Sequence, residues 1–157
     1  MEGGVSAGPV PAAGRFERLE SVGERLFVYG TLQFAPVLEE LLGRTPDSDF
    51  AVARGRRVAA LPGRLYPGLV AQPGRMAAGL ILNGLTRAEW EVIDAFEDDE
   101  YELHRIPLIG RDEPVPAYVW TAEVARNDWN AEVFATDHLD RYVARFARRP
   151  GDRGADR

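Results

Sequence analysis

Two short segments of the chain carry groups that could do chemistry. The first is a Tyr-Gly-Thr-Leu run, from Tyr29 to Leu32, at the end of an apolar stretch. The second is Glu97, which begins an acidic run at the end of a helical pattern. A turn with free backbone N–H groups suits a carboxylate or the oxyanion of an acyl transfer, and a glutamate beside it can move a proton. We interpret the two segments as one site.

The Tyr-Gly-Thr-Leu run is expected to form a turn after a strand. Residues 26–29 have the pattern of a short buried strand, and Gly30 allows a positive φ or a close approach to a ligand. Thr31 adds a hydroxyl, and the backbone of Leu32 extends the row of donors. A tight turn without a ligand explains the same run, because a strand followed by a glycine turn is common.

A capping box predicts the start of the helix that leads to Glu97. Thr86 and Glu89 have the required spacing, and Leu85 can pack on Trp90 as a hydrophobic staple. Apolar residues then recur at helical spacing, so Glu97 lies at the C-terminal end of the core-facing stripe. Burial, the helix dipole and neighbouring acids predict a raised pKa for Glu97, as acid/base catalysis near neutral pH requires. A solvated acidic helix end is the alternative interpretation.

Together, the two segments resemble the γ-glutamyl cyclotransferase-like family, in its γ-glutamylamine cyclotransferase and plant avirulence-induced branch. The resemblance covers roughly residues 26–120 and agrees in order and separation. The residues that carry it are Val28-Tyr29-Gly30-Thr31-Leu32 and Asp94-Ala95-Phe96-Glu97-Asp98-Asp99-Glu100-Tyr101. The resemblance implies an α+β fold, a small mixed β-barrel with flanking helices whose cavity binds a γ-glutamyl group.

The resemblance also implies a reaction. The α-amine of a γ-glutamyl group attacks its own γ-carbonyl, which closes a lactam, releases 5-oxoproline and expels the attached amine. Glu97 matches the family's general acid/base, and the run Tyr29–Leu32 matches the loop that holds the glutamyl end. Tyr118 is either a residue that lines the cavity, as in relatives, or a core tyrosine. The implied partner is a small γ-glutamyl substrate, and no cofactor or metal is implied.

Two places depart from the family pattern. Relatives often carry an arginine two residues after the tyrosine that follows the glutamate. Here Tyr101 is followed by Glu102 and Leu103, with the nearest basic residues at His104 and Arg105. Gln33 also stands where many relatives have a basic residue. The basic contact to the substrate, the leaving amine and the pathway, whether amino-acid turnover or natural-product biosynthesis, therefore stay open.

Two other functions are compatible with the same residues. One is a non-catalytic barrel that binds a small carboxylate, and the other is an amide hydrolase in which water replaces the internal amine. The product separates them, since cyclisation gives 5-oxoproline and hydrolysis gives glutamate. A metal site is poorly supported, because His104 and His138 lie on different expected elements without recognisable ligand spacing.

Composition narrows the class of protein. The net charge of −6 argues against nucleic-acid and anionic-membrane partners. All 19 basic residues are Arg and there is no Cys, which excludes lysine Schiff bases and thiol nucleophiles. Without a signal-peptide or membrane-spanning pattern, we expect a soluble cytoplasmic protein. The Ala-, Arg- and Gly-rich composition indicates a GC-rich bacterial source, and monomer and homodimer are both open.

The elements that must position the site are expected within one domain, residues 25–149. Residues 1–24 are rich in Gly, Ala and Pro and are expected to be a flexible leader without a function, and residues 150–157 a disordered tail. With 157 residues, the chain is long enough for one core and short for two.

Within this domain, the pattern predicts helices around a small sheet. A helix should begin at Pro36 and end at Gly43. Short β-prone runs over residues 50–82 have the rhythm of a barrel or meander. Two strands follow, over 101–109 and 115–120, and a C-terminal amphipathic helix begins near Leu139.

Overall fold

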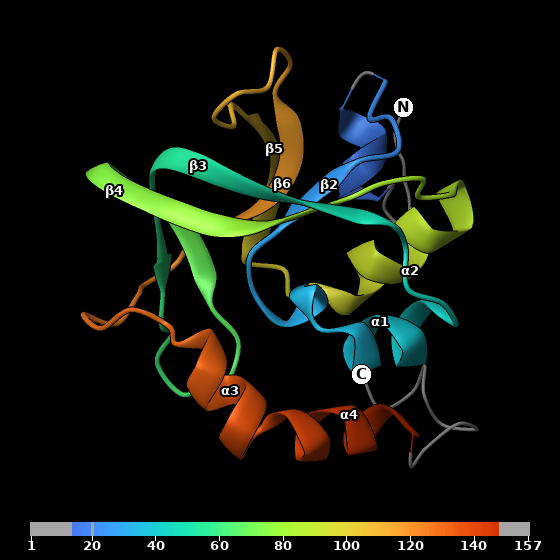
Figure 1. Ribbon diagram of the computed structural model, residues 1–157, viewed down its shortest axis with the longest axis vertical. Helices are drawn as coiled ribbons and strands as arrows, with labels where there is room; N and C mark the ends of the chain where they lie inside the picture. Colours follow the sequence, from blue (N-terminus) through green and yellow to red (C-terminus); the bar gives the residue numbers. More distant parts are fainter. Residues whose placement is uncertain (1–13, 20, 148–157) are drawn as a thin grey trace, which may run out of the picture.

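Five β-strands build a mixed sheet, shown in Figure 1. The structure is a computed structural model that describes residues 14–19 and 21–147. In chain order the strands are β2 (Leu26–Val28), β3 (Ser48–Ala59), β4 (Gly68–Leu82), β5 (Tyr101–Ile106) and β6 (Val115–Trp120). They lie in the order β3-β4-β2-β6-β5, with β2 and β6 parallel and the other neighbours antiparallel. The predicted α+β class and mixed sheet are confirmed.

The sheet curls without closing into the predicted barrel. No ladder joins the edge strands β3 and β5 among the described residues. One backbone hydrogen bond links the two edges. The N–H of Ile109, just after the end of β5, donates to the Val52 carbonyl of β3 at 2.9 Å. Pro107 follows β5 directly and has no N–H with which to continue a ladder. The sheet is therefore roughly barrel-like but open, with its edges meeting at one point.

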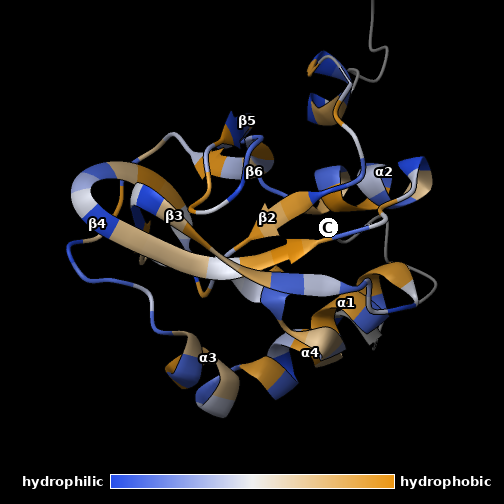
Figure 2. Ribbon diagram, turned by 45° about the horizontal axis from the view of Figure 1, so that its top comes forward, coloured by the Kyte–Doolittle hydropathy of each residue, from blue (hydrophilic) through white to orange (hydrophobic). Residues whose placement is uncertain are grey.

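Helices pack against the sheet and carry one part of the core. They are η1 (Arg15–Arg18), η2 (Thr31–Gln33), α1 (Ala35–Leu42), α2 (Arg87–Phe96), α3 (Ala131–Asp137) and α4 (Leu139–Ala147). Figure 1 shows α3 and α4 running along one side of the molecule, with α1 and α2 beside β2. In Figure 2, β2 is hydrophobic along its length, whereas α3 alternates between hydrophobic and hydrophilic residues. Among the described residues, no helix combines the length and the apolar character that crossing a bilayer would require.

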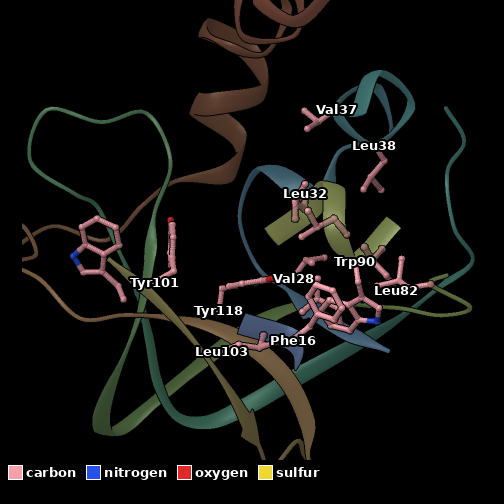
Figure 3. Close-up of a cluster of buried hydrophobic side chains, with 14 of the residues drawn as sticks. Phe16, Val28, Leu32, Val37, Leu38, Leu82, Trp90, Tyr101, Leu103 and Tyr118 are labelled. Atoms are coloured by element: carbon pink, nitrogen blue, oxygen red, sulfur yellow. The ribbon is translucent and has the colours of Figure 1, made fainter. Parts of the chain in front are cut away.

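The short central strand β2 divides the core into two parts. Leu26 and Val28 belong to the cluster that packs against the helices, which includes Trp90 (Figure 3). Phe27 belongs to the second cluster, with Ile81 of β4. Successive side chains of a strand point to opposite faces, so β2 is buried on both. This strand leads directly into the Tyr-Gly-Thr-Leu run and gives that run a rigid support.

The helix signals of the sequence are confirmed. Gly43 ends α1 in the left-handed conformation, with φ of 80°. Thr86 accepts a hydrogen bond from the Glu89 N–H at 3.1 Å, while the Glu89 carboxylate accepts one from the Thr86 N–H at 3.0 Å. Leu85 and Trp90 are both buried in the same cluster. α4 begins at Leu139 as predicted.

Residues 50–82 differ from the expected series of short strands. They form most of β3 and β4, two long strands that pair over nearly their whole length. The register shifts at Gly55, which has φ of 77°. Gly74, with φ of 88°, lies within β4 opposite this shift. These glycines therefore form a bulge that bends the hairpin, where the sequence pattern suggested turns between strands. The helix α3 was not predicted.

The expected flexible leader is wrong for the part that the structure describes. η1 lies against α2, and Phe16 is only 4% exposed. Its ring stacks on Trp90, with centroids 5.9 Å apart and planes 16° from parallel. A buried aromatic side chain makes this segment part of the core, although its Gly- and Ala-rich surroundings suggested disorder. The remaining leader residues 1–13 and the predicted tail 150–157 lie outside the described residues.

We predict that Phe16→Ala lowers the free energy of unfolding by about 3 kcal/mol, because it leaves a cavity beside Trp90. Urea denaturation followed by circular dichroism measures the change. Arg18→Ala is the matched control, since Arg18 is exposed on the same short helix and its loss should have little effect. Equal stability of Phe16→Ala and the wild type would show that this segment contributes nothing to the domain.

Candidate active site

One cavity brings the two segments together. It has a volume of about 510 Å³ and lies where the end of β2, the end of α2 and α4 meet. All four residues from Tyr29 to Leu32 line it, as do Glu97 and Tyr118. Tyr142 and Arg145 of α4 add a wall from the C-terminal part of the chain. The residues that the sequence singled out therefore share one space, although they come from distant parts of the chain.

The Tyr-Gly-Thr-Leu run turns without a left-handed residue. Gly30 has φ of −124°, so the positive φ considered for it is wrong. A glycine is needed there because of a neighbour within the chain, since a Cβ at Gly30 would lie 2.8 Å from two ring carbons of Pro67, whereas the expected close approach to a ligand stays a prediction. The N–H groups of Thr31 and Leu32 precede the first hydrogen bond of η2, from the Gln33 N–H to the Gly30 carbonyl at 3.1 Å. Such groups have no partner within the turn.

A second set of contacts fixes this turn from the side. The Gln33 side-chain amide donates to the Tyr29 carbonyl at 2.8 Å and to the Gly30 carbonyl at 3.2 Å. The Tyr29 hydroxyl donates to the Tyr118 carbonyl at 2.6 Å. The two carbonyls of the turn are thus held by Gln33. Gln33, which the sequence marked only as a departure from relatives, thus supports the turn.

Glu97 occupies the C-cap of α2. Its N–H donates to the Ile93 carbonyl at 3.1 Å, and its backbone then leaves the helix in an extended conformation. Burial raises the pKa of Glu97 to about 8, Arg15 opposes the rise, and Asp98 and Asp94 add to it. The side chain lines the cavity and keeps partial exposure, so a small molecule can reach it. The predicted raised pKa is confirmed, with burial as its main cause.

Tyr118 lines the cavity and also belongs to the core. It is 3% exposed, and its hydroxyl donates to Asp94 Oδ1 at 2.7 Å. Burial raises the pKa of the Tyr118 hydroxyl, and the charge of Asp94 adds to the effect. The phenol therefore stays protonated and acts as a fixed donor. Tyr118 therefore belongs to the core cluster and also borders the cavity, and its contact with a substrate stays a prediction.

The structure adds residues that sequence reasoning missed. Tyr66, from the loop between β3 and β4, lines the cavity, and its hydroxyl donates to Asp98. Arg145 also lines it and is the one basic residue among the described lining residues. Arg15 contacts the end of α2 through Asp94, with Nε and Oδ1 3.0 Å apart. The sequence offered one signal for such a cation, an acidic helix end without a basic residue of its own.

Neither histidine belongs to the cavity. His104 pairs with the exposed Glu102 at 2.9 Å, and His138 lies beside Phe134. Within residues 14–19 and 21–147, no three histidine, aspartate or glutamate side chains are grouped so that they could hold a metal ion.

Solved structures with the same architecture place this fold among known ones. A protein solved under the name γ-glutamyl cyclotransferase aligns with 79% of this chain and 86% of its own, with a TM-score of 0.55 and 10% identity, a likeness of fold alone. The solution structure of an Arabidopsis thaliana protein covers 78% of this chain and 87% of its own, with a TM-score of 0.59 and 30% identity. The fold is therefore γ-glutamyl cyclotransferase-like.

The family follows from the sequence comparison. The family model described as gamma-glutamyl cyclotransferase, AIG2-like, matches residues 26–137, and the chain belongs to this family. A relative, AIG2-like protein A of Arabidopsis thaliana, is 31% identical over 128 residues, which are 77% of this chain and 78% of the relative. The resemblance found in the sequence is confirmed. The plant relatives named here do not support the bacterial source that composition indicated.

We predict that Glu97→Gln changes how stability depends on pH. The folded state keeps a proton on Glu97 up to about pH 8, whereas the ordinary pKa is 4.5. The stabilisation is complete below the ordinary pKa and is lost as the pH rises through the folded-state value. Relative to Glu97→Gln, the wild type should therefore lose roughly 2–4 kcal/mol of unfolding free energy between pH 5 and pH 9.

Urea denaturation at several pH values measures this difference. Glu91→Gln, on the exposed side of the same helix, is the control and should follow the wild type. Parallel curves for Glu97→Gln and the wild type would contradict a raised pKa of Glu97.

Proposed function

We propose that the protein is a γ-glutamyl cyclotransferase that releases 5-oxoproline from a γ-glutamyl amine or another γ-glutamyl conjugate. The observation that carries the proposal is Glu97, a carboxyl group with a pKa of about 8 in the same cavity as the turn Tyr29–Leu32. Membership of the family supports the reaction class. The cavity volume of about 510 Å³ lies within the range of roughly 300–1,000 Å³ typical of small-molecule sites.

In this reaction the substrate supplies its own nucleophile. The α-nitrogen forms a bond to the γ-carbon while the bond from that carbon to the leaving nitrogen breaks, so the products are 5-oxoproline and an amine. Glu97 takes a proton from the α-amine and then delivers one to the leaving nitrogen, which leaves the enzyme unchanged. A pKa near the working pH lets one group do both. Holding the chain bent so that its ends meet supplies the proximity effect.

The glutamyl end fits the groups that face the cavity from two sides. The N–H groups of Thr31 and Leu32 can donate to a carboxylate or carbonyl oxygen. Arg145 of α4 is exposed and borders the same cavity, and it supplies the cation that sequence reasoning could not assign. We assign Arg145 to the α-carboxylate of the substrate, because a guanidinium binds carboxylates through paired donors.

A cyclising enzyme explains the site better than a binding-only barrel. A pocket that only binds a carboxylate does not need a carboxyl group whose pKa lies near the working pH, whereas acid/base catalysis does. An amide hydrolase would use the same glutamate with water as nucleophile, and the product distinguishes the two reactions. The expected small-molecule partner belongs to this proposal, while the oligomeric state and a cytoplasmic location stay predictions.

We predict that the purified protein releases 5-oxoproline from at least one member of a panel of γ-glutamyl amines, γ-glutamyl amino acids and glutathione. Glu97→Gln should lower the rate by about 10²–10⁴-fold, because the amide cannot transfer the proton. Chromatography with mass detection separates 5-oxoproline from glutamate. Glu91→Gln removes a charge from the solvent side of the same helix and should keep the wild-type rate.

Each result decides between the candidate functions. 5-Oxoproline that depends on Glu97 supports the cyclotransferase, and glutamate as the product would replace it with a hydrolase. Normal turnover by a folded Glu97→Gln variant would sink the mechanism.

We predict that Arg145→Gln raises KM by about 10-fold with a small change in kcat, since a contact to the substrate carboxylate is the same in the ground and transition states. Steady-state kinetics with the best substrate of the panel measures both constants. Arg141→Gln is the matched control, because Arg141 lies one turn earlier on α4 and does not line the main cavity. Equal effects of both substitutions would show that the positive charge of α4 acts at a distance, and that Arg145 makes no specific contact with the substrate.

A further inference from the structure

The C-terminal end of α2 carries backbone carbonyl groups that need donors from outside the helix. Its C-cap residue is Glu97 in an extended conformation, and its last turn contains no basic residue. The final carbonyl groups of a helix have no partners within the helix and carry the negative end of its dipole. Asp94 and Asp98 place further negative charge at the same end. The helix end that carries Glu97 therefore needs donors and positive charge from elsewhere.

Arg15 supplies both from far away in the sequence. One terminal nitrogen of its guanidinium donates to the Asp98 carbonyl at 2.8 Å and the Tyr101 carbonyl at 2.9 Å. The other donates to the carbonyl groups of Asp94 and Glu97, the latter at 3.0 Å. The guanidinium thus binds the backbone on both sides of Glu97. A planar fork of donors can do this, whereas a single ammonium cannot.

The Asp94 carboxylate locks Arg15 in this position. Its Oδ2 accepts the Arg15 backbone N–H at 2.9 Å, and its Oδ1 accepts the Arg15 Nε–H at 3.0 Å. The Tyr118 hydroxyl donates to the same Oδ1 at 2.7 Å, and the guanidinium lies 5.3 Å from the centre of the Tyr118 ring. The side chains of Arg15 and Asp94 are 15% and 12% exposed, so solvent screens the pair only weakly.

The neighbouring residues anchor this segment on α2. Phe16 stacks on Trp90, and Glu17 forms an ion pair with Arg87 at the first turn of the helix. The Arg87 guanidinium also lies 5.4 Å from the centre of the Phe16 ring. These contacts hold the segment around Arg15 against α2 and place the guanidinium at the C-terminal end of that helix.

We propose that Arg15 is a positioning residue for Glu97: it fixes the backbone from Asp94 to Tyr101, and so the direction in which the Glu97 carboxyl enters the cavity. Arg15 lies before residues 26–137, the stretch that the family model matches. It is thus not part of the stretch that defines the family. The catalytic consequence rests on the proposed function, whereas the effect on the protonation of Glu97 does not.

Arg15 also sets the charge around Glu97. Its positive charge lowers the pKa of Glu97 against the larger effect of burial. Other groups facing Glu97 come from β2, α2, β5, β6, α4 and the loops beside them, namely Tyr29, Tyr66, Asp94, Asp98, Asp99, Tyr101, Tyr118, Tyr142 and Arg145. Without Arg15, its guanidinium would no longer offset the negative charges of Asp98 and Asp94 beside Glu97. The pKa of Glu97 would then rise further, and less of the base form would be present at neutral pH.

The test compares Arg15→Gln, Arg15→Lys and the control Arg18→Gln in the full chain. Two readouts are taken, the pH titration of the Glu97 carboxyl by carbon NMR and the pH profile of 5-oxoproline release. In Arg15→Gln the NMR midpoint and the acidic limb of kcat/KM should both move up by about one pH unit, and kcat should fall about 10-fold or more. Arg18 is exposed on the same short helix, so its substitution should change neither.

Arg15→Lys separates charge from geometry. It keeps the cation, so the titration midpoint should stay close to that of the wild type. It lacks the fork of donors, so kcat should stay reduced. This split is the expected result, and thermal melting confirms that each variant is folded.

Two results would overturn the proposal. One is a folded Arg15→Gln variant with wild-type kcat and an unchanged Glu97 titration. The other is an equal loss of kcat in both Arg15 variants with the titration unmoved, which would make Arg15 a purely structural residue. If the wild type releases no 5-oxoproline, the proposed function fails, and the titration alone then decides whether Arg15 controls Glu97.

Discussion

The constraint on which this structure depends is the placement of a carboxyl group between an apolar core and an open cavity. A charged carboxylate in such a place is unfavourable, because the protein cannot replace the water that would solvate it. Within the part of the chain that the structure describes, no direct ion pair to Glu97 removes this penalty. The fold lets the pKa rise to about 8 and moderates the rise with Arg15, whose guanidinium binds the backbone around Glu97. The pKa of Glu97 is thereby kept close to neutral pH, where the carboxyl group can both release and accept a proton.

The sheet makes this arrangement rigid. β2 is buried on both faces and pairs in parallel with β6, so the end of β2 and Tyr118 of β6 are held at the same side of the cavity. The Tyr29 hydroxyl binds the Tyr118 carbonyl, and the Tyr118 hydroxyl binds Asp94 on α2. Through Tyr118, these hydrogen bonds connect the turn Tyr29–Leu32 to the helix end that carries Glu97. Movement of either segment would break its hydrogen bond to Tyr118.

The features that the sequence predicted are those with local causes. Thr86 and Glu89 define a helix start within four residues, and Gly43 defines a helix end by itself. The direction of the Glu97 pKa followed in the same way from its helix position and its neighbours. Arg15 was missed because 79 residues separate it from Asp94, and a composition rich in Gly and Ala hides the one buried Phe beside it. The open sheet was missed because a single contact between Ile109 and Val52 leaves no pattern in the sequence.

The position of Arg15 also bears on what a domain is in this protein. The stretch that the family model matches is residues 26–137, and it contains both motifs. The physical unit begins earlier, because four carbonyl groups around the end of α2 find donors on a residue outside that stretch. A domain boundary placed at the start of the family match would separate the end of α2 from the donors of Arg15. Arg15 and the matched stretch are therefore parts of one folded structure, and cutting the chain at residue 26 would take the donors away from these carbonyl groups.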